Sequence, residues 1–168
     1  MRIHLGTRLL AVMGTALLGL SLLSITALAH ESRNVDKYKL AVGFITEPAI
    51  EGQKNGIDLR VSNVSDPAAA KPVIGLEKTL QVEITHVPSK TTKTFAIRAI
   101  FNDAGHYTND LIMTAPGQYK FRFFGTIEGV NVNETFTSGP GTFGDVETSA
   151  DLQFPQSFPQ MRDRKSVV

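Results

Sequence analysis

Three histidines and one aspartate are the side chains of this sequence best suited to bind a metal ion. His30, His86 and His106 follow an apolar N-terminal segment, and Asp103 precedes His106 in Asn-Asp-Ala-Gly-His-Tyr. Neutral imidazole nitrogens in a square arrangement suit Cu(II), and a histidine at a free N-terminus adds its amine. One hypothesis is therefore a copper site of His30, His106 and Asp103. The alternative is that Asp103 and His106 are ordinary turn residues and that His30 is a frayed terminus.

The remaining candidate ligands do not extend this site. His86 has the parity of the apolar residues in its predicted strand, 80–84, which places it at the inward end of that strand. We interpret it as a rim histidine whose ring bonds to a backbone group. Only Met113 and Met161 follow the N-terminal segment, so a methionine-rich Cu(I) site is excluded.

The sequence carries no motif of a hydrolytic or phosphate-binding active site. Gly-x-Ser-x-Gly, His-Glu-x-x-His and a glycine loop before a helix are all absent, and there is no cysteine. Glu47, Glu51, Asp58 and Glu83 fall on predicted turns and outward strand positions, where we interpret them as solvated carboxylates. We therefore expect a protein that is not an enzyme.

The first 29 residues are predicted to be a signal peptide. Arg2 and Arg8 precede an uncharged run from Leu9 to Ala29 that ends in Ala-Leu-Ala, the small-x-small pattern of signal peptidase cleavage. Cleavage there makes His30 the first residue. The alternative is a retained membrane anchor, because about 20 apolar residues span a bilayer. Either interpretation places the rest of the chain outside the cytoplasm: secreted, periplasmic, or on the outer face of the cell membrane.

The balance of charged residues after residue 29 limits the kinds of partner to expect. Of the 17 lysines and arginines, Arg2 and Arg8 lie in the leader, which leaves 15 basic against 16 acidic residues. This near-neutral balance argues against a nucleic-acid partner. We expect a protein or membrane-associated partner, with membrane contact only if the leader is retained. Without cysteine, an exported domain must depend on its apolar core for stability.

Short runs of alternating apolar and polar residues follow the leader, which is the pattern of β-strands. The seven clear runs begin at Tyr38, Ile57, Leu80, Phe95, Tyr107, Tyr119 and Val130. A weaker eighth run spans Val146 to Phe154. Seven to eight such strands predict an all-β fold, a single antiparallel sandwich over residues 30–155, followed by a disordered tail over 156–168.

One segment resembles a known corner of immunoglobulin-like domains. In Ala115-Pro116-Gly117-Gln118-Tyr119-Lys120-Phe121 a turn leads to a tyrosine, and a core residue follows two places later. An exported, cysteine-free sandwich with this strand resembles the YtkA-like and CopC-like group of bacterial extracytoplasmic domains. That resemblance implies an immunoglobulin-type fold and a role in copper handling or as a membrane-protein accessory.

The resemblance also bears on the candidate copper site. CopC-type proteins begin, after cleavage, with a histidine, which His30 matches. They also carry an Asp-x-His pair, whereas this chain has one residue more, in Asp103-Ala104-Gly105-His106.

The sequence thus predicts a secreted, non-catalytic β-sandwich that acts as a binding or accessory module without a cofactor. The alternative is an extracytoplasmic copper carrier that uses His30. For the module, the predicted contact surface is Phe124 with the loop 137–144, because Phe124 has the opposite parity to its inward-facing neighbours Tyr119, Phe121 and Phe123.

Overall fold

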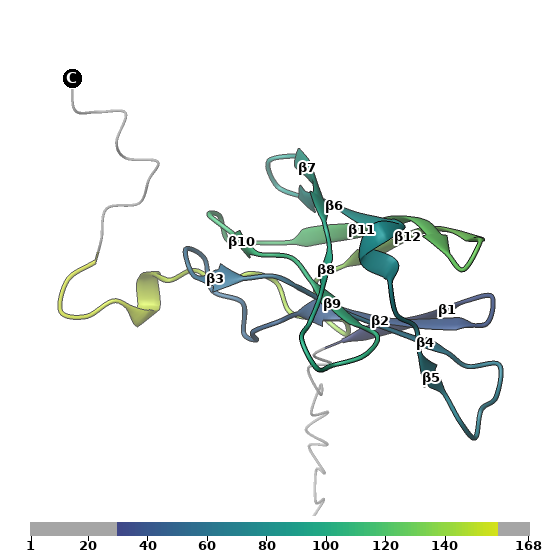
Figure 1. Ribbon diagram of the computed structural model, residues 1–168. Coiled ribbons are helices and arrows are strands. Elements are labelled where there is room, and N and C mark those ends of the chain that lie inside the picture. The colour runs from purple at the N-terminus through teal and green to yellow at the C-terminus, as the bar shows by residue number, and fades with distance from the viewer. Residues whose placement is uncertain (1–29, 158–168) are drawn as a thin grey trace, which may run out of the picture.

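The computed structural model describes residues 30–157. The predicted signal peptide, 1–29, and most of the predicted tail, from residue 158 on, lie outside the described residues. Two antiparallel sheets face each other in the part described, with a short ribbon beside them (Figure 1). The predicted all-β sandwich is therefore confirmed. Within residues 30–157 no helix has the length and apolarity to span a membrane.

The first sheet carries the candidate metal ligands. Its strand order is β1-β2-β4-β9-β8, with β5 paired to β4 beside this path. The strands are β1 (Glu31–Val35), β2 (Tyr38–Phe44), β4 (Ile57–Asn63), β5 (Lys71–Pro72), β8 (Arg98–Ala99) and β9 (His106–Thr108). Every pair in this sheet is antiparallel.

The second sheet has the order β12-β11-β6-β7. Its strands are β6 (Leu80–His86), β7 (Thr91–Ala96), β11 (Tyr119–Ile127) and β12 (Val130–Thr137). The ribbon pairs β3 (Lys54–Asn55) with β10 (Leu111–Ile112). Two short 3-10 helices complete the described chain, η1 (Leu76–Lys78) and η2 (Ala150–Leu152).

The core lies between the two sheets and is built from the predicted inward faces. Alternate residues of β2, β4, β6 and β11 are buried: Tyr38, Leu40, Val42, Ile57, Leu59, Val61, Leu80, Val82, Ile84, Tyr119, Phe121 and Phe123. Phe44 of β2 meets Phe121 of β11 edge to face at 5.2 Å between ring centroids. Phe143 stacks on Phe121 at 5.2 Å. Side chains of both sheets thus interdigitate across the sandwich.

The tyrosine corner is present as the sequence predicted. The hydroxyl of Tyr119 donates a hydrogen bond to the carbonyl oxygen of Ala115 at 2.8 Å. Gly117, between them, has φ 115°, a backbone conformation that residues with a Cβ rarely adopt. The glycine therefore allows the turn, and the tyrosine closes it.

The predicted eighth strand is wrong. Between residues 146 and 154 the chain makes only isolated bridges, Gly117 with Val146 and Ile50 with Glu147, before η2 begins. The carboxylate of Glu51 accepts hydrogen bonds from the hydroxyl of Thr148 at 2.8 Å and from the backbone N–H of Ser149 at 3.1 Å. These bonds turn the chain away from a ladder. They also correct the expectation that Glu51 is solvated, since it is buried.

The predicted contact surface is less open than the sequence suggested. Phe124 is half-buried, with the guanidinium of Arg122 4.5 Å from its ring centroid. In the loop 137–144, Phe143 is fully buried in the core. Among residues 30–157, the aromatic side chains that stand in solvent are Phe101 and Phe154, 89% and 93% exposed.

His86 is a rim histidine, as interpreted from the sequence. Its Nδ1 lies 2.7 Å from the hydroxyl of Ser89, and its Nε2 lies 3.1 Å from the carbonyl oxygen of Pro116. Both ring nitrogens are therefore occupied by hydrogen bonds within the fold, and the ring serves to join the end of β6 to the tyrosine corner.

Candidate metal site

Strand register brings His30 towards Asp58 across the first sheet. Glu31 pairs with Val42, so His30, one residue earlier, is level with Gly43 of β2. Gly43 in turn pairs with Asp58 of β4. A glycine within a strand often marks a close approach of other groups. Because Gly43 has no side chain, the imidazole of His30 can extend over β2 and reach the carboxylate of Asp58.

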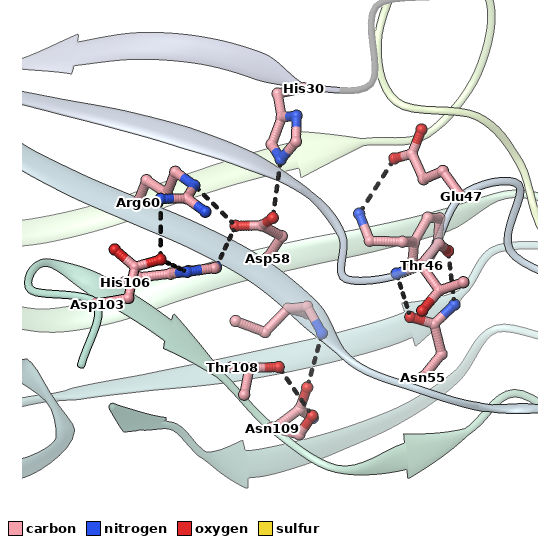
Figure 2. Close-up of polar contacts among 12 residues, drawn as sticks. His30, Thr46, Glu47, Asn55, Asp58, Arg60, Asp103, His106, Thr108 and Asn109 are labelled. Atoms are coloured by element: carbon pink, nitrogen blue, oxygen red, sulfur yellow. Dashed lines mark hydrogen bonds and ion pairs between the residues drawn. The ribbon is translucent and has the colours of Figure 1, made fainter. Parts of the chain in front are cut away.

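Asp58 joins the two histidines that the sequence analysis placed in one site. Its Oδ2 lies 3.0 Å from Nε2 of His30, and its Oδ1 lies 2.8 Å from Nε2 of His106 (Figure 2). His106 begins β9 and pairs with Arg60, so it sits diagonally beside Asp58 on the outward face of the sheet. The three side chains therefore converge from the residue before β1, from β4 and from β9.

Asp103 faces the other nitrogen of the His106 ring. Its Oδ2 is 2.6 Å from Nδ1 of His106. The turn between β8 and β9 sets this geometry through Asn102 and Gly105, with φ 58° and 74°. A Cβ on Gly105 would lie 2.7 Å from the carbonyl oxygen of Val61, so the turn packs tightly on β4. The hydrogen bond from His106 lowers the pKa of the Asp103 carboxyl below its ordinary value.

Arg60 joins the two carboxylates. Its Nη1 donates to Oδ2 of Asp103 at 3.3 Å, and its Nε lies 3.7 Å from Oδ1 of Asp58. Arg60, Asp103, His106 and Asp58 thereby form a closed ring of contacts, which we call the Arg60 ring (Figure 2). His30 is attached to this ring through Asp58 alone.

Glu47 adds negative charge at the margin of the site. Its Oε1 accepts a hydrogen bond from the backbone N–H of Phe44 at 3.2 Å. Desolvation raises the pKa of the Glu47 carboxyl, the negative charge of Asp58 adds to that rise, and the bond from Phe44 and the nearby His30 oppose it. The site thus holds three acidic side chains against one arginine.

Three buried atoms at the centre of the site make close polar contacts that lack the alignment of a hydrogen bond. They are Nε2 of His30, Nε2 of His106 and Oδ1 of Asp58. If Nδ1 of His106 carries the proton that faces Asp103, a neutral ring presents a lone pair from Nε2 to Asp58. A cation bound between these atoms would satisfy all three.

The side chains are not, however, arranged as a finished metal site. Across residues 30–157, no group of three or more acidic, histidine or cysteine side chains has the geometry to hold a metal ion. The carboxylate of Asp58 lies between the two Nε2 atoms and occupies the space that an ion would need. Binding would therefore require the carboxylate to turn aside by a side-chain rotation.

The sequence analysis identified two of the three central residues. His30 and His106 do lie together, and Asp103 does contact His106, but on the nitrogen that points away from Asp58. Asp58 was interpreted as a solvated carboxylate, and this is wrong, because it is 7% exposed. The prediction that the side chain of Asp58 points outward from its strand was correct. Only the pairing of β1, β2, β4 and β9 reveals that this outward position is covered.

The fold has solved counterparts. No protein-family model matches this chain, and no curated protein sequence matches it. A crystal structure of FetP from uropathogenic E. coli matches with a TM-score of 0.52 and 11% identity, covering 71% of this chain and 96% of that one. A variant of FetP described as copper-bound matches with a TM-score of 0.48 and 12% identity, covering 65% and 91%. The copper-reconstituted P19 protein of Campylobacter jejuni gives 0.45 and 11%, covering 64% and 88%. The FetP match shows that this chain shares a known β-sandwich fold, consistent with the sandwich that the resemblance to CopC-like domains implies.

Proposed function

We propose that this protein is an extracytoplasmic, non-catalytic carrier of Cu(II). The proposed ligands are His30, His106 and Asp58, with Asp103 holding His106 in position. The observation that carries the proposal is the convergence of two imidazole nitrogens on one carboxylate, with Nε2 of His30 3.0 Å from Oδ2 of Asp58 and Nε2 of His106 2.8 Å from its Oδ1.

The donor set favours Cu(II) over the other ions that nitrogen and oxygen ligands bind. Two imidazoles and one carboxylate suit Cu(II), Ni(II) and Zn(II), and the affinity of such a site rises to a maximum at copper. Cu(I) prefers sulfur. Met113, the described methionine, is buried beside His86 and Tyr119 at the second sheet, not beside His30. The site therefore offers the nitrogen and oxygen ligands that Cu(II) prefers.

Cleavage of the leader adds a fourth donor to this proposal. A free amine at His30 can chelate a metal together with the Nδ1 of its own ring. In the described arrangement it is Nε2 that faces Asp58, so such a chelate requires the His30 ring to turn. The side chain of His30 is 35% exposed, against 7% for His106, so an ion would gain access from the side of His30.

The test is a Cu(II) titration of the protein that begins at His30, followed by electron paramagnetic resonance. We expect one bound ion with nitrogen hyperfine structure. His106→Ala and Asp58→Asn should each weaken binding by at least ten-fold. His86→Ala is the matched control, because that histidine is engaged by Ser89 and Pro116 at the other sheet, and it should bind as the parent does.

Two results would overturn the proposal. One is a parent protein that binds no Cu(II). The other is a His106→Ala variant that binds as tightly as the parent. In either case the protein would remain a β-sandwich binding or accessory module without a metal, with a protein or membrane-associated partner.

A further inference from the structure

We infer that the free edge of β7 and the groove beside it bind an extended segment of a partner protein, one that carries an acidic residue between apolar residues. β7 is the last strand of the second sheet and pairs with β6 alone. Five of its six residues are exposed, and the sixth, Phe95, is half-buried. A strand at the edge of a sheet presents unpaired N–H and C=O groups, to which an extended peptide can add as a further strand.

No other segment of the described chain occupies this edge. Within residues 30–157, no backbone–backbone hydrogen bond joins residues 92–96 to anything but β6. The edges on the opposite side of the sandwich differ, because Arg33 of β1 contacts Glu134 of β12 at 2.8 Å and so links the two outer strands there. The β7 edge is therefore open to an added strand.

The sandwich is also open on the core-facing side of β7. In the ladder with β6, Lys93 is opposite Ile84, and Phe95 is opposite Val82. Opposite residues of two paired strands share one face of the sheet, and Ile84 and Val82 are buried in the core. Lys93 is nevertheless exposed. A groove of about 300 Å³ lies here, between β7 and residues 111–115.

The groove offers apolar contacts to the side chains of an added strand. Ile84 and Met113, both buried, line it together with Ile112, which is 55% exposed. Successive side chains of a strand point to opposite faces, so every second residue of the added strand would face the groove. Apolar residues at these positions would cover Phe95 and Ile112.

Lys93 determines which charge the added strand must carry. Its Nζ lies 5.0 Å from the ring centroid of Phe95, and no carboxylate of residues 30–157 forms an ion pair with it. A lysine on the inward face of an edge strand opposes pairing with a copy of itself. An acidic residue opposite Lys93, with its Cβ roughly 5 Å away, would supply the missing counter-ion. Charge complementarity therefore favours an acidic partner segment over a second copy of this chain.

The test is a peptide titration of the isotope-labelled protein that begins at His30, followed by NMR. The probe is the capped peptide Thr-Val-Thr-Glu-Thr-Val-Thr, which places the glutamate and both valines on one face of a strand. We expect saturable shifts of the backbone amide signals of β7 and of residues 111–115. The same peptide with lysine in place of glutamate should bind about five-fold more weakly, because it places like charges opposite each other. Lys93→Glu should reverse this preference.

Two controls separate strand addition from other binding. Lys120→Gln removes an exposed lysine of the same sheet from β11, and this variant should bind both peptides as the parent does. A glutamate peptide with methylated backbone nitrogens cannot donate hydrogen bonds to the edge and should leave the β7 signals unchanged.

The inference is wrong if millimolar glutamate peptide produces no saturable shifts in β7, if the methylated peptide binds equally well, or if Lys93→Glu keeps the preference of the parent. Light scattering that shows a dimer, with β7 signals that shift as the protein alone is concentrated, would assign the edge to a second copy and overturn the inference. All these measurements are made without Cu(II), so they leave the proposed function untouched.

Discussion

Nε2 of His106 lies 2.8 Å from Oδ1 of Asp58, in a close polar contact without the alignment of a hydrogen bond. On the opposite side of the ring, Nδ1 makes a 2.6 Å hydrogen bond with Asp103. The two carboxylates thus have different relations to one imidazole. Asp103 holds the ring by a hydrogen bond. Asp58 approaches the ring at a distance that is favourable only with a proton or a cation between its Oδ1 and Nε2 of His106. This asymmetry assigns different roles to the two aspartates.

Asp103 should act by positioning His106. Outer partners of this kind contribute about 10–100-fold to metal affinity. Asp103→Ala should therefore weaken Cu(II) binding by about that factor while the electron paramagnetic resonance spectrum keeps its nitrogen pattern. Asp103→Asn keeps an oxygen that can accept the Nδ1–H bond and should lose less. If Asp103→Ala changes the set of directly bound ligands, Asp103 is itself a ligand.

The free amine of His30 should strengthen Cu(II) binding. One glycine placed ahead of His30 turns that amine into an amide and removes a nitrogen donor. We expect a sharp loss of affinity in the extended protein, measured by competition with a chelator of known affinity, with an unchanged melting temperature in the absence of metal. Equal affinities for the two proteins would show that only the imidazole of His30 takes part.

Phe121 should be a major contributor to stability. It is fully buried and packs against both Phe44 and Phe143. Phe121→Ala removes these contacts and leaves a cavity, which should lower the free energy of unfolding by about 3–5 kcal/mol. Lys120, its exposed neighbour in β11, provides the control, and Lys120→Ala should cost less than about 0.5 kcal/mol. Urea unfolding measures both, and equal losses would contradict the face assignment.

Tyr119→Phe tests the tyrosine corner separately from the core. The substitution keeps the ring and removes the bond to the carbonyl oxygen of Ala115. A net loss of about 0.5–1.5 kcal/mol in the free energy of unfolding is expected for one hydrogen bond. Tyr107→Phe is a useful comparison, because its hydroxyl donates to the carbonyl oxygen of Val73 at 2.7 Å elsewhere in the core. A fully stable Tyr119→Phe protein would mean that Pro116 and Gly117 define the turn unaided.

Acid should weaken the link between β3 and β8 through Asp110. Hydrogen bonds from Arg98 and from Lys54 lower the pKa of Asp110 from 3.8 to about 2. A carboxyl whose pKa is lower in the folded state contributes stability above its unfolded pKa and loses it as pH falls towards the folded value. The contribution of Asp110 should therefore disappear between about pH 4 and pH 2.

Unfolding curves of the parent and of Asp110→Asn at pH 5 and pH 2 measure this effect. The variant should be less stable than the parent at pH 5, and the two should converge at pH 2. Asp151→Asn, an exposed aspartate of η2, is the control. The carboxyl is exposed, so the difference will be modest and will shrink with added salt. A gap between Asp110→Asn and the parent that persists at pH 2 would contradict the assignment.

Alternation predicted the sheets well because each strand has one face in the core. The inward residues of β2, β4, β6 and β11 follow directly from period two. The predicted run from Tyr107 to Met113 is instead divided, since β9 belongs to the first sheet and β10 pairs with β3 in the ribbon. The alternation of apolar and polar residues within a strand does not indicate which sheet the strand joins.

The candidate site shows the same limit. His30 and His106 were recognised by residue type, which sequence records directly. The burial of Asp58 depends on a glycine in one strand, the register of two more, and a turn held by Asn102 and Gly105. Each of these is visible in the sequence, but only their combination places a carboxylate between two imidazoles.

The position of His30 has a consequence for the margin of the first sheet. β1 is an outer strand, paired with β2 alone, whereas β9 lies beyond β4. A metal ion bound by both His30 and His106 would connect the start of β1 to β9. These two strands share no backbone hydrogen bonds, because β2 and β4 lie between them. Outer strands open locally more often than central ones. Copper should therefore slow amide hydrogen exchange in β1 far more than in β7, the outer strand of the other sheet.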